Sequence, residues 1–270
     1  MYSMWGRLKE WFWPGGRPVY VPSAGLYVPG ELAGWFADYE PLTSSTFLNA
    51  LRPGMTVVDV GAHIGYYSVH AAQRVGSAGT VYAIEPSQEN RTLLTKNLRA
   101  QGLTRVRVLP YAAGATNKRR MLQITAGRDM NSFYGHPASR TICQVEVEQV
   151  ALDSVIHEPV HAIKLDVEGA ELEALEGMRR ILAENDLILC VEWNPKCLRH
   201  AGCDPMDLPN LLMKLGFTSL VLVEDEARLT MPLEEAIRTR RPQDDAQCFF
   251  NIIAQKVKHT SLPVSERIPA

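Results

Sequence analysis

The stretch T-V-V-D-V-G-A-H-I-G at residues 56–65 limits the possible folds more than any other part of the chain. Its β-branched run predicts a buried strand. Gly61 and Gly65 then bracket a turn, and residues 66–75 have helical spacing and end before Gly76. A strand, a glycine turn and a helix in this order bring backbone N–H groups and the positive end of a helix to the carboxyl edge of a sheet. The stretch therefore predicts a nucleotide-like ligand, although an ordinary α/β turn gives the same pattern.

Apolar strands and amphipathic helices alternate along most of the chain. Further strands are predicted at 80–84, 106–109, 162–167, 187–191, 218–223 and 248–254. Helices are predicted from Ser87 to Gly102, over 171–182, and from Asp204 and Pro205 to Gly216. This order predicts an α/β fold with a doubly wound, mostly parallel, seven-stranded sheet of the Rossmann-like kind. Residues 110–150 break the rhythm and predict a small insertion, with strands at 119–125 and 143–150 around a loop.

The chain of 270 residues divides into three parts. Residues 1–52 form an N-terminal extension, 53–256 the α/β domain and 257–270 a polar tail. Aromatic residues within 1–16 share one helical face. Because this segment carries few basic residues, a helix packed on the domain, on a partner subunit or over the active site is favoured over an interfacial membrane helix.

The balance of charge, 28 basic against 30 acidic residues, argues against a nucleic-acid binder that works mainly by electrostatics. No apolar run approaches the ~20 residues of a membrane span, and no secretory signal is visible. The cysteines are scattered without a C-x-x-C pair, which favours a reducing cytoplasm. A metal site at Cys197, His200 and Cys203 lacks a second group of ligands and is not favoured.

Carboxylates follow the predicted strands, where ligands of such sheets bind. They are Asp59, Glu85, Asp166, Glu168 and Glu192. The turn lacks both the Gly-Lys-Ser/Thr of a P-loop and the G-x-G-x-x-G of a dinucleotide site, which counts against an NAD(P)-dependent oxidoreductase, the main alternative enzyme. S-adenosylmethionine carries a ribose, an ammonium and a sulfonium but no phosphate. Its charge pattern fits an acidic site better, and a carboxylate at position 85 can accept ribose hydroxyls.

Three motifs resemble those of the FkbM-type methyltransferases, a family of class I S-adenosylmethionine-dependent enzymes. They are D-V-G-A-H-I-G-Y-Y-S at 59–68, A-I-E-P at 83–86 and I-K-L-D-V-E-G-A-E at 163–171. The third is the most specific, because it is not a generic turn. The resemblance runs from about residue 39 to Trp193. It departs from the family at His63, where asparagine is usual.

The resemblance implies a set of cofactor contacts. It places Asp59 toward the ammonium, Glu85 on the ribose, Asp166 facing the methyl group and Glu40 closing over the cofactor. The remaining implied contacts are the methionine-side residues Gly61, Ala62, His63 and Gly65, and the adenine-side residues Pro86 and Ser87.

The resemblance also implies O-methylation of a small molecule, either a natural product or a sugar. Methylation of nitrogen or carbon, a peptide or protein acceptor, and a non-catalytic cofactor-binding protein are the alternatives. Asp166 is the first candidate for the base, Glu168 the second, and Glu192 follows. A divalent ion such as magnesium, held by these carboxylates, is an alternative to a base, and no metal ligand is assigned.

Specificity for the acceptor is expected from the parts that depart from the regular rhythm. These are residues 1–40, 126–140 and 193–205. Loops on a rigid scaffold usually carry such specificity. Phe133, Tyr134 and His136 are therefore predicted to lie near the transferred methyl group.

Overall fold

The structure is a computed structural model that describes residues 17–126, 130–239, 241 and 249–256. The aromatic helix predicted within 1–16 and the polar tail at 257–270 lie outside these residues. Within the described ranges, no helix is long and apolar enough to cross a bilayer.

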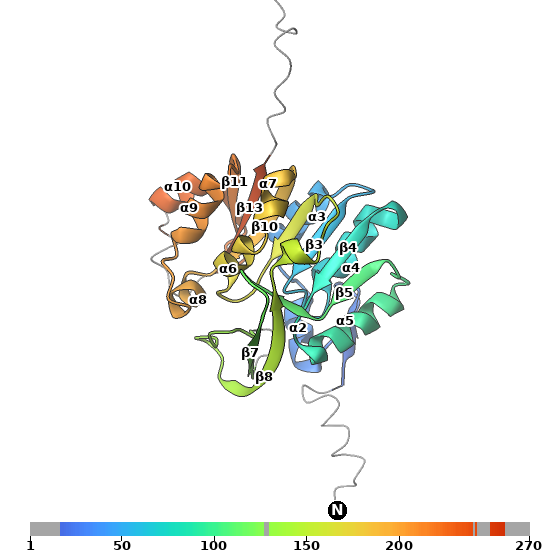
Figure 1. The fold of residues 1–270 in the computed structure, drawn as a ribbon. Coiled ribbons are helices and arrows are strands. Elements are labelled where there is room, and N and C mark those ends of the chain that lie inside the picture. Colours follow the sequence, from blue (N-terminus) through green and yellow to red (C-terminus); the bar gives the residue numbers. More distant parts are fainter. Residues whose placement is uncertain (1–16, 127–129, 240, 242–248, 257–270) are drawn as a thin grey trace, which may run out of the picture.

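An eight-stranded sheet forms the centre of the molecule (Figure 1). Five strands run parallel, and three more join antiparallel at one edge. In spatial order the strands are β12 (Leu229–Pro232), β11 (Ser219–Glu224), β13 (Phe250–Lys256), β10 (Leu187–Trp193), β9 (Ala162–Leu165), β3 (Thr56–Val60), β4 (Thr80–Ile84) and β5 (Val106–Leu109). The doubly wound, mostly parallel sheet predicted from the sequence is confirmed.

The predicted number of seven strands is wrong by one edge strand. β12 follows a tight turn closed by the Arg228 N–H donating to the Asp225 carbonyl, and it pairs with β11. It is short and ends at Pro232, which an edge position tolerates because the outer side of the strand needs no N–H donor. Its composition gives little strand signal.

Helices cover both faces of the sheet because successive strand residues point to opposite sides. Val57 and Val81 pack with helices of one layer, whereas Val58 and Val60 pack with the other. The first layer holds α3 (Pro41–Ala50), α4 (Tyr66–Val75) and α5 (Gln88–Ala100). The second holds α6 (Glu171–Glu176), α7 (Arg179–Glu184), α8 (Pro195–His200), α9 (Asp207–Lys214) and α10 (Leu233–Thr239).

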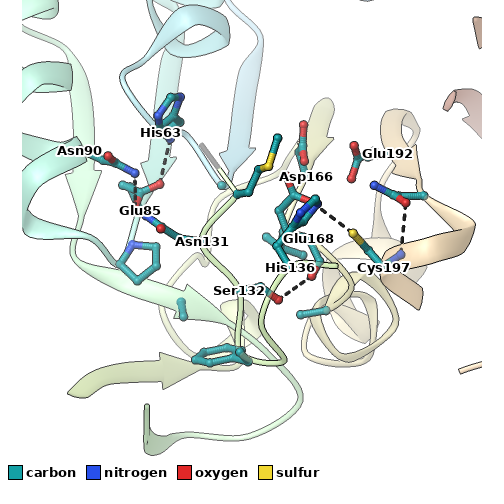
Figure 2. A pocket seen from close by; sticks show the side chains of 18 of the residues that line it. His63, Glu85, Asn90, Asn131, Ser132, His136, Asp166, Glu168, Glu192 and Cys197 are labelled. Atoms are coloured by element: carbon teal, nitrogen blue, oxygen red, sulfur yellow. Dashed lines mark hydrogen bonds and ion pairs between the residues drawn. The ribbon is translucent and has the colours of Figure 1, made fainter. Parts of the chain in front are cut away.

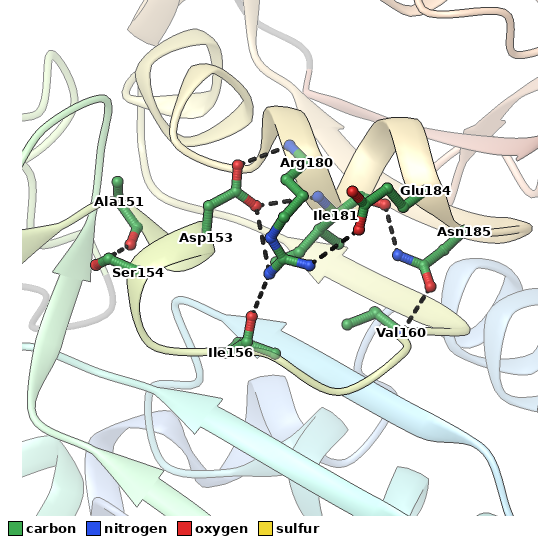
Figure 3. Close-up of polar contacts among 9 residues, drawn as sticks. All are labelled: Ala151, Asp153, Ser154, Ile156, Val160, Arg180, Ile181, Glu184 and Asn185. Carbon is green, nitrogen blue, oxygen red and sulfur yellow. Dashed lines mark hydrogen bonds and ion pairs between the residues drawn. The ribbon is translucent and has the colours of Figure 1, made fainter.

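The helix predicted over 171–182 is divided into α6 and α7. A Cβ at Gly177 would lie 2.0 Å from the Gly114 carbonyl oxygen, so the chain approaches its neighbour too closely for any other residue. Asp153 then caps the second helix from outside, its carboxylate accepting the N–H groups of Arg180 (2.6 Å) and Ile181 (3.0 Å) (Figure 3). The break is thus fixed by tertiary contacts.

The sequence predicted some helix starts correctly and others not. Ser87 caps α5 as predicted, accepting the Asn90 N–H. The helix expected from Pro205 begins later, at Asp207, because the Asp204 side chain accepts the Met206 N–H and forms a turn. α8 was not predicted, although Asn194 caps it and Pro195 opens it.

Two additions flank the carboxyl edge of the sheet. The insertion is a small sheet of β6 (Tyr111–Ala113), β8 (Thr141–Val150) and β7 (Lys118–Thr125), in that order (Figure 1). The N-terminal extension contributes β1 (Val19–Val21), β2 (Leu26–Val28) and α2 (Ala33–Phe36). Short 3-10 turns complete the fold at Gly30–Leu32, Gly76–Ala78 and Leu152–Ser154.

After β3 the chain moves outward to β5 and returns to β9 on the other side of β3. The strand order therefore switches between β3 and β9, which is where ligands bind in such sheets.

Candidate active site

A cavity of about 330 Å³ lies at this switch point, enclosed by strand ends, the insertion and the N-terminal extension (Figure 2). All three predicted catalytic carboxylates line it, one of which, Asp166, is also a predicted cofactor contact, together with five further predicted cofactor residues. These are Glu40, Gly61, His63, Glu85, Pro86, Asp166, Glu168 and Glu192. The other predicted cofactor residues, Asp59, Ala62, Gly65 and Ser87, do not line it.

Glu85 is held by fixed donors at the end of β4. Its Oε2 accepts the His63 N–H at 2.9 Å, and its Oε1 accepts the Ser87 N–H at 2.8 Å and the Asn90 amide at 3.3 Å. A carboxylate has about four acceptor positions, so one remains on Oε2. Burial raises the pKa of Glu85 to about 7, although the hydrogen bonds from these three donors lower it.

The glycine turn after β3 is shaped by contacts within the protein. A Cβ at Gly61 would lie 1.7 Å from the Asp166 carbonyl oxygen, and its φ is +83°. At Gly65 a Cβ would lie 3.1 Å from the Leu94 side chain, at a φ of +94°. Close packing between neighbouring segments, together with the positive φ angles, therefore requires glycine at both positions.

Asp59 lies behind the cavity wall. It is 2% exposed, and it accepts the Ser68 hydroxyl at 2.5 Å. Burial raises its pKa to about 6. Its contact with a ligand ammonium stays a prediction, and in this structure the carboxylate fixes the start of α4.

Strained backbone gathers around the cavity. Glu40, His63 and Glu168 line it and have positive φ angles of 42°, 49° and 53°. Such angles are uncommon outside glycine and often mark functional sites.

The His63 ring is buried, and burial lowers its pKa to about 4. The ring is therefore neutral and does not contribute a cation to the cavity.

Lys164 is a buried cation to which the motifs assigned no role. It is 1% exposed, and its Nζ lies 3.0 Å from Asp166 Oδ2. Burial alone would lower its pKa, but the carboxylates of Asp166 and Glu40 raise it well above the ordinary value. The sequence pattern that could have identified it is a lysine within an apolar strand, two residues before Asp166 and therefore on the same face of the strand.

Glu40 is buried at the start of α3. It accepts the Tyr67 hydroxyl, and burial raises its pKa while Lys164 opposes that shift. It lines the cavity beside Tyr39 and Trp35, and its closure over the cofactor stays a prediction.

Glu168 is positioned by the insertion loop. His136 Nε2 lies 3.3 Å from its Oε2, and the Cys197 thiol donates to the same oxygen at 3.5 Å. The Ser132 hydroxyl donates to the Glu168 carbonyl at 2.7 Å (Figure 2). Burial raises the pKa of this carboxyl, whereas the His136 contact lowers it.

Glu192 and Glu171 are buried acids with different surroundings. Glu171 Oε1 accepts the Val167 and Gly169 N–H groups, so this residue holds the loop after β9. Glu192 lines the cavity, and burial together with Asp166 and Glu168 raises its pKa well above the ordinary range.

The predicted acceptor residues divide. Phe133 and His136 line the cavity. The Tyr134 hydroxyl instead donates to Glu173, which also pairs with Arg120. Tyr134 therefore supports the insertion.

The lining residues fit a cationic ligand without phosphate. Among the described residues that line the cavity, five are acidic and Lys196 is the single lysine or arginine. A pyrophosphate would meet these carboxylates without a compensating cluster of cations. The charge of the lining thus fits S-adenosylmethionine better than a dinucleotide.

Two relatives resemble the chain over part of their length. The hexuronic acid methyltransferase AglP of Haloferax volcanii is 29% identical over 161 residues, which are 57% of this chain and 59% of that protein. The crystal structure of methyltransferase FkbM from Methylobacillus flagellatus matches with a TM-score of 0.51 at 21% identity, covering 82% of this chain and 52% of that one. The chain thus spans just over half the length of each. At this identity the structural likeness concerns the fold, which is the Rossmann-like class I methyltransferase fold.

The family assignment rests on the domain that contains the cavity. The family model of the methyltransferase FkbM domain matches residues 59–202, just over half of the chain, from the glycine turn through the strand ends that carry Asp166 and Glu192. The resemblance inferred from the three motifs is confirmed, and the chain belongs to the FkbM methyltransferase domain family.

Proposed function

We propose that the protein transfers a methyl group from S-adenosylmethionine to a hydroxyl oxygen of a small molecule, in particular a sugar. The observation that carries this proposal is the acidic cavity at the switch point, with Glu85 at one strand end and Asp166, Glu168 and Glu192 at two others. Family membership supports the methyl transfer. The acidic lining supports a cationic cofactor.

Glu85, the glycine turn and Asp166 would hold the cofactor. The acceptor position left on Glu85 Oε2 suits a ribose hydroxyl. The turn at Gly61 and His63 would border the methionine part, and Pro86 and Asn90 would border the adenine. S-adenosylmethionine supplies an activated methyl group, whose S–C bond breaks as the new O–C bond forms.

The chain itself aligns the acceptor and accepts its proton. Alignment of two reactants can contribute up to ~7–11 kcal/mol to lowering the barrier. A positioned base adds about 10²–10⁴-fold in rate. Asp166 is already paired with the Lys164 ammonium, whose Nζ lies 3.0 Å from its Oδ2. Glu168 has a raised pKa and is oriented by His136, so it becomes the better candidate for the base, ahead of Asp166.

The sugar acceptor is inferred from the Haloferax relative, whose name specifies a hexuronic acid. Polar groups of the insertion loop, including Asn131, Ser132 and His136, line the cavity and suit a polyol. Phe133 and Tyr111 provide apolar surface beside them.

Two measurements test the proposal. Calorimetry should detect binding of S-adenosylhomocysteine and no binding of NAD. Mass spectrometry should then find a gain of one methyl group on a member of a panel of glycosides and uronic acids, on oxygen. Tight binding of NAD without S-adenosylhomocysteine would contradict the cofactor, and transfer to nitrogen or carbon would contradict the acceptor.

A further inference from the structure

Glu192 carries a buried oxygen without a partner. The residue is 6% exposed and lines the cavity, and its Oε2 has no hydrogen-bond partner among the residues that the structure describes. A buried carboxylate oxygen without a donor is costly in free energy. Either a proton or a bound cation would satisfy it.

Two further carboxylates lie beside that of Glu192. Oxygen atoms of Asp166, Glu168 and Glu192 all lie within 4.8 Å of one another, and Figure 2 shows the Glu192 carboxylate next to that of Asp166. Oxygen ligands on opposite sides of Mg²⁺ lie ~4.2 Å apart, and on opposite sides of Ca²⁺ about 4.8 Å apart. The three oxygens therefore lie within the span of Ca²⁺ and would have to close by at most about 0.6 Å to fit that of Mg²⁺.

The nearby nitrogen and sulfur donors are committed elsewhere. His136 Nδ1 accepts the Ala138 N–H at 3.1 Å, so in the neutral ring Nε2 carries the proton and faces Glu168 Oε2. Neither nitrogen then offers a lone pair to a metal. The Cys197 thiol donates to the same glutamate oxygen at 3.5 Å. These two groups hold Glu168 in place, as partners of metal ligands commonly do.

The local charge also favours a cation. The buried ammonium of Lys164 lies 3.0 Å from Asp166 Oδ2 and so compensates one of the three carboxylates. At least two negative charges would remain uncompensated if all three acids were ionised. We propose that Asp166, Glu168 and Glu192 bind one hard divalent cation, of the magnesium or manganese class, at the carboxyl ends of β9 and β10.

The cation would give the acceptor a binding position. An octahedral ion with three protein ligands keeps the rest of its coordination sphere for substrate oxygens and water. The carboxylate of a sugar acid and a hydroxyl beside it could occupy two of these positions. The negative charge of that carboxylate would then no longer be repelled by the acidic cavity. A bound cation also lowers the pKa of a coordinated hydroxyl, so with the ion in place it takes over the role assigned above to Glu168 as base, and the hydroxyl proton passes to water. This role rests on the proposed function, whereas the existence of the cation site does not.

The test is a titration of the full chain with Mn²⁺, without methyl donor or acceptor. Binding is monitored through the electron paramagnetic resonance signal of free Mn²⁺. We expect saturable binding of one ion per chain, which Mg²⁺ displaces. Glu192→Gln should weaken the affinity at least about tenfold, the loss of one charge-assisted ligand. Glu176→Gln is the matched control, because Glu176 pairs with Arg179 on the surface, and it should leave the affinity unchanged.

Folding of the variants is checked by thermal unfolding, and Glu168→Gln replaces Glu192→Gln if the latter does not fold. Absence of saturable Mn²⁺ binding, or equal affinity in the folded Glu192 or Glu168 variant, would overturn the site and leave a proton as the partner of Glu192. Strong ¹⁴N coupling to bound Mn²⁺ would overturn it as well, since it would place His136 in the coordination sphere. Binding of S-adenosylhomocysteine, measured separately, decides the proposed function independently of either result.

Discussion

The two ends of the cavity each present a buried glutamate, but they surround it differently. Glu85 accepts three N–H groups, two of them from the backbone. Glu192 leaves one oxygen without any partner among the described groups. The first end is fixed before a ligand arrives, because its donors belong to the turn and to the start of α5. The second is completed only by what binds there. A cofactor common to a family suits the first end, and a variable acceptor or a cation suits the second.

The largest expected effect is on stability and concerns the contact between Gly61, in the turn at the cofactor end, and Asp166, at the acceptor end. Gly61→Ala would place a methyl group 1.7 Å from the Asp166 carbonyl oxygen at a φ of +83°. Strain and overpacking together should lower the free energy of unfolding by about 2–5 kcal/mol. Urea unfolding measures this.

Gly54→Ala is the matched control for that variant. Gly54 has nearly the same φ, +85°, but among the described residues no atom beyond its chain neighbours lies within 4 Å of the position that its added methyl group would take. It should lose only the conformational part, about 1–2 kcal/mol. Equal losses in the two variants would show that the packing of Gly61 against Asp166 is unimportant.

The acceptor end is tested by Glu168→Gln and Asp166→Asn. Each removes a charge and keeps the shape, so turnover at saturating cofactor should fall by about 10²-fold or more. Glu168→Gln should have the larger effect if this residue takes the proton. Wild-type turnover in both variants would leave alignment alone, or Glu192, to explain the rate.

The cofactor end is tested by Glu85→Ala. Charge-assisted hydrogen bonds contribute ~1.5–3 kcal/mol, so the affinity for S-adenosylmethionine should fall roughly 10–150-fold. Calorimetry provides the dissociation constant. Gln88→Ala is the control, because Gln88 is an exposed neighbour at the start of α5. An unchanged affinity in Glu85→Ala would contradict the proposed contact between Glu85 and the ribose.

The smallest effect is a pH dependence of cofactor binding. Burial raises the pKa of Glu85 to about 7 in the free protein, and ribose hydroxyls donate to the ionised form. Below this pH, binding must first release a proton, so affinity should fall as pH decreases, by at most about tenfold per unit. Above it, affinity should be level. Glu85→Gln should flatten the profile, and a wild-type profile that is flat from pH 5 to 8 would contradict the assignment.

The sequence was informative where local pattern and tertiary role coincide. The strand, turn and helix at 56–75 were predicted with their observed bounds, and four of the five strand-end carboxylates line one cavity, whereas Asp59 lies behind its wall. The division between α6 and α7 was not predictable, because it depends on Gly177 meeting Gly114, a contact between segments far apart in the sequence. Lys164 was overlooked for a similar reason: a lysine in an apolar strand acquires its meaning from the acids around it.

The loop between β7 and β8 has a consequence for engineering. Ser132 and His136 belong to the part of the chain that would be exchanged to alter substrate preference, yet both contact Glu168. A graft of this loop from another enzyme would therefore change the orientation of a reactive group together with the shape of the pocket. Chimeras that keep Ser132 and His136 while varying the positions between them offer a route to new acceptors without loss of turnover.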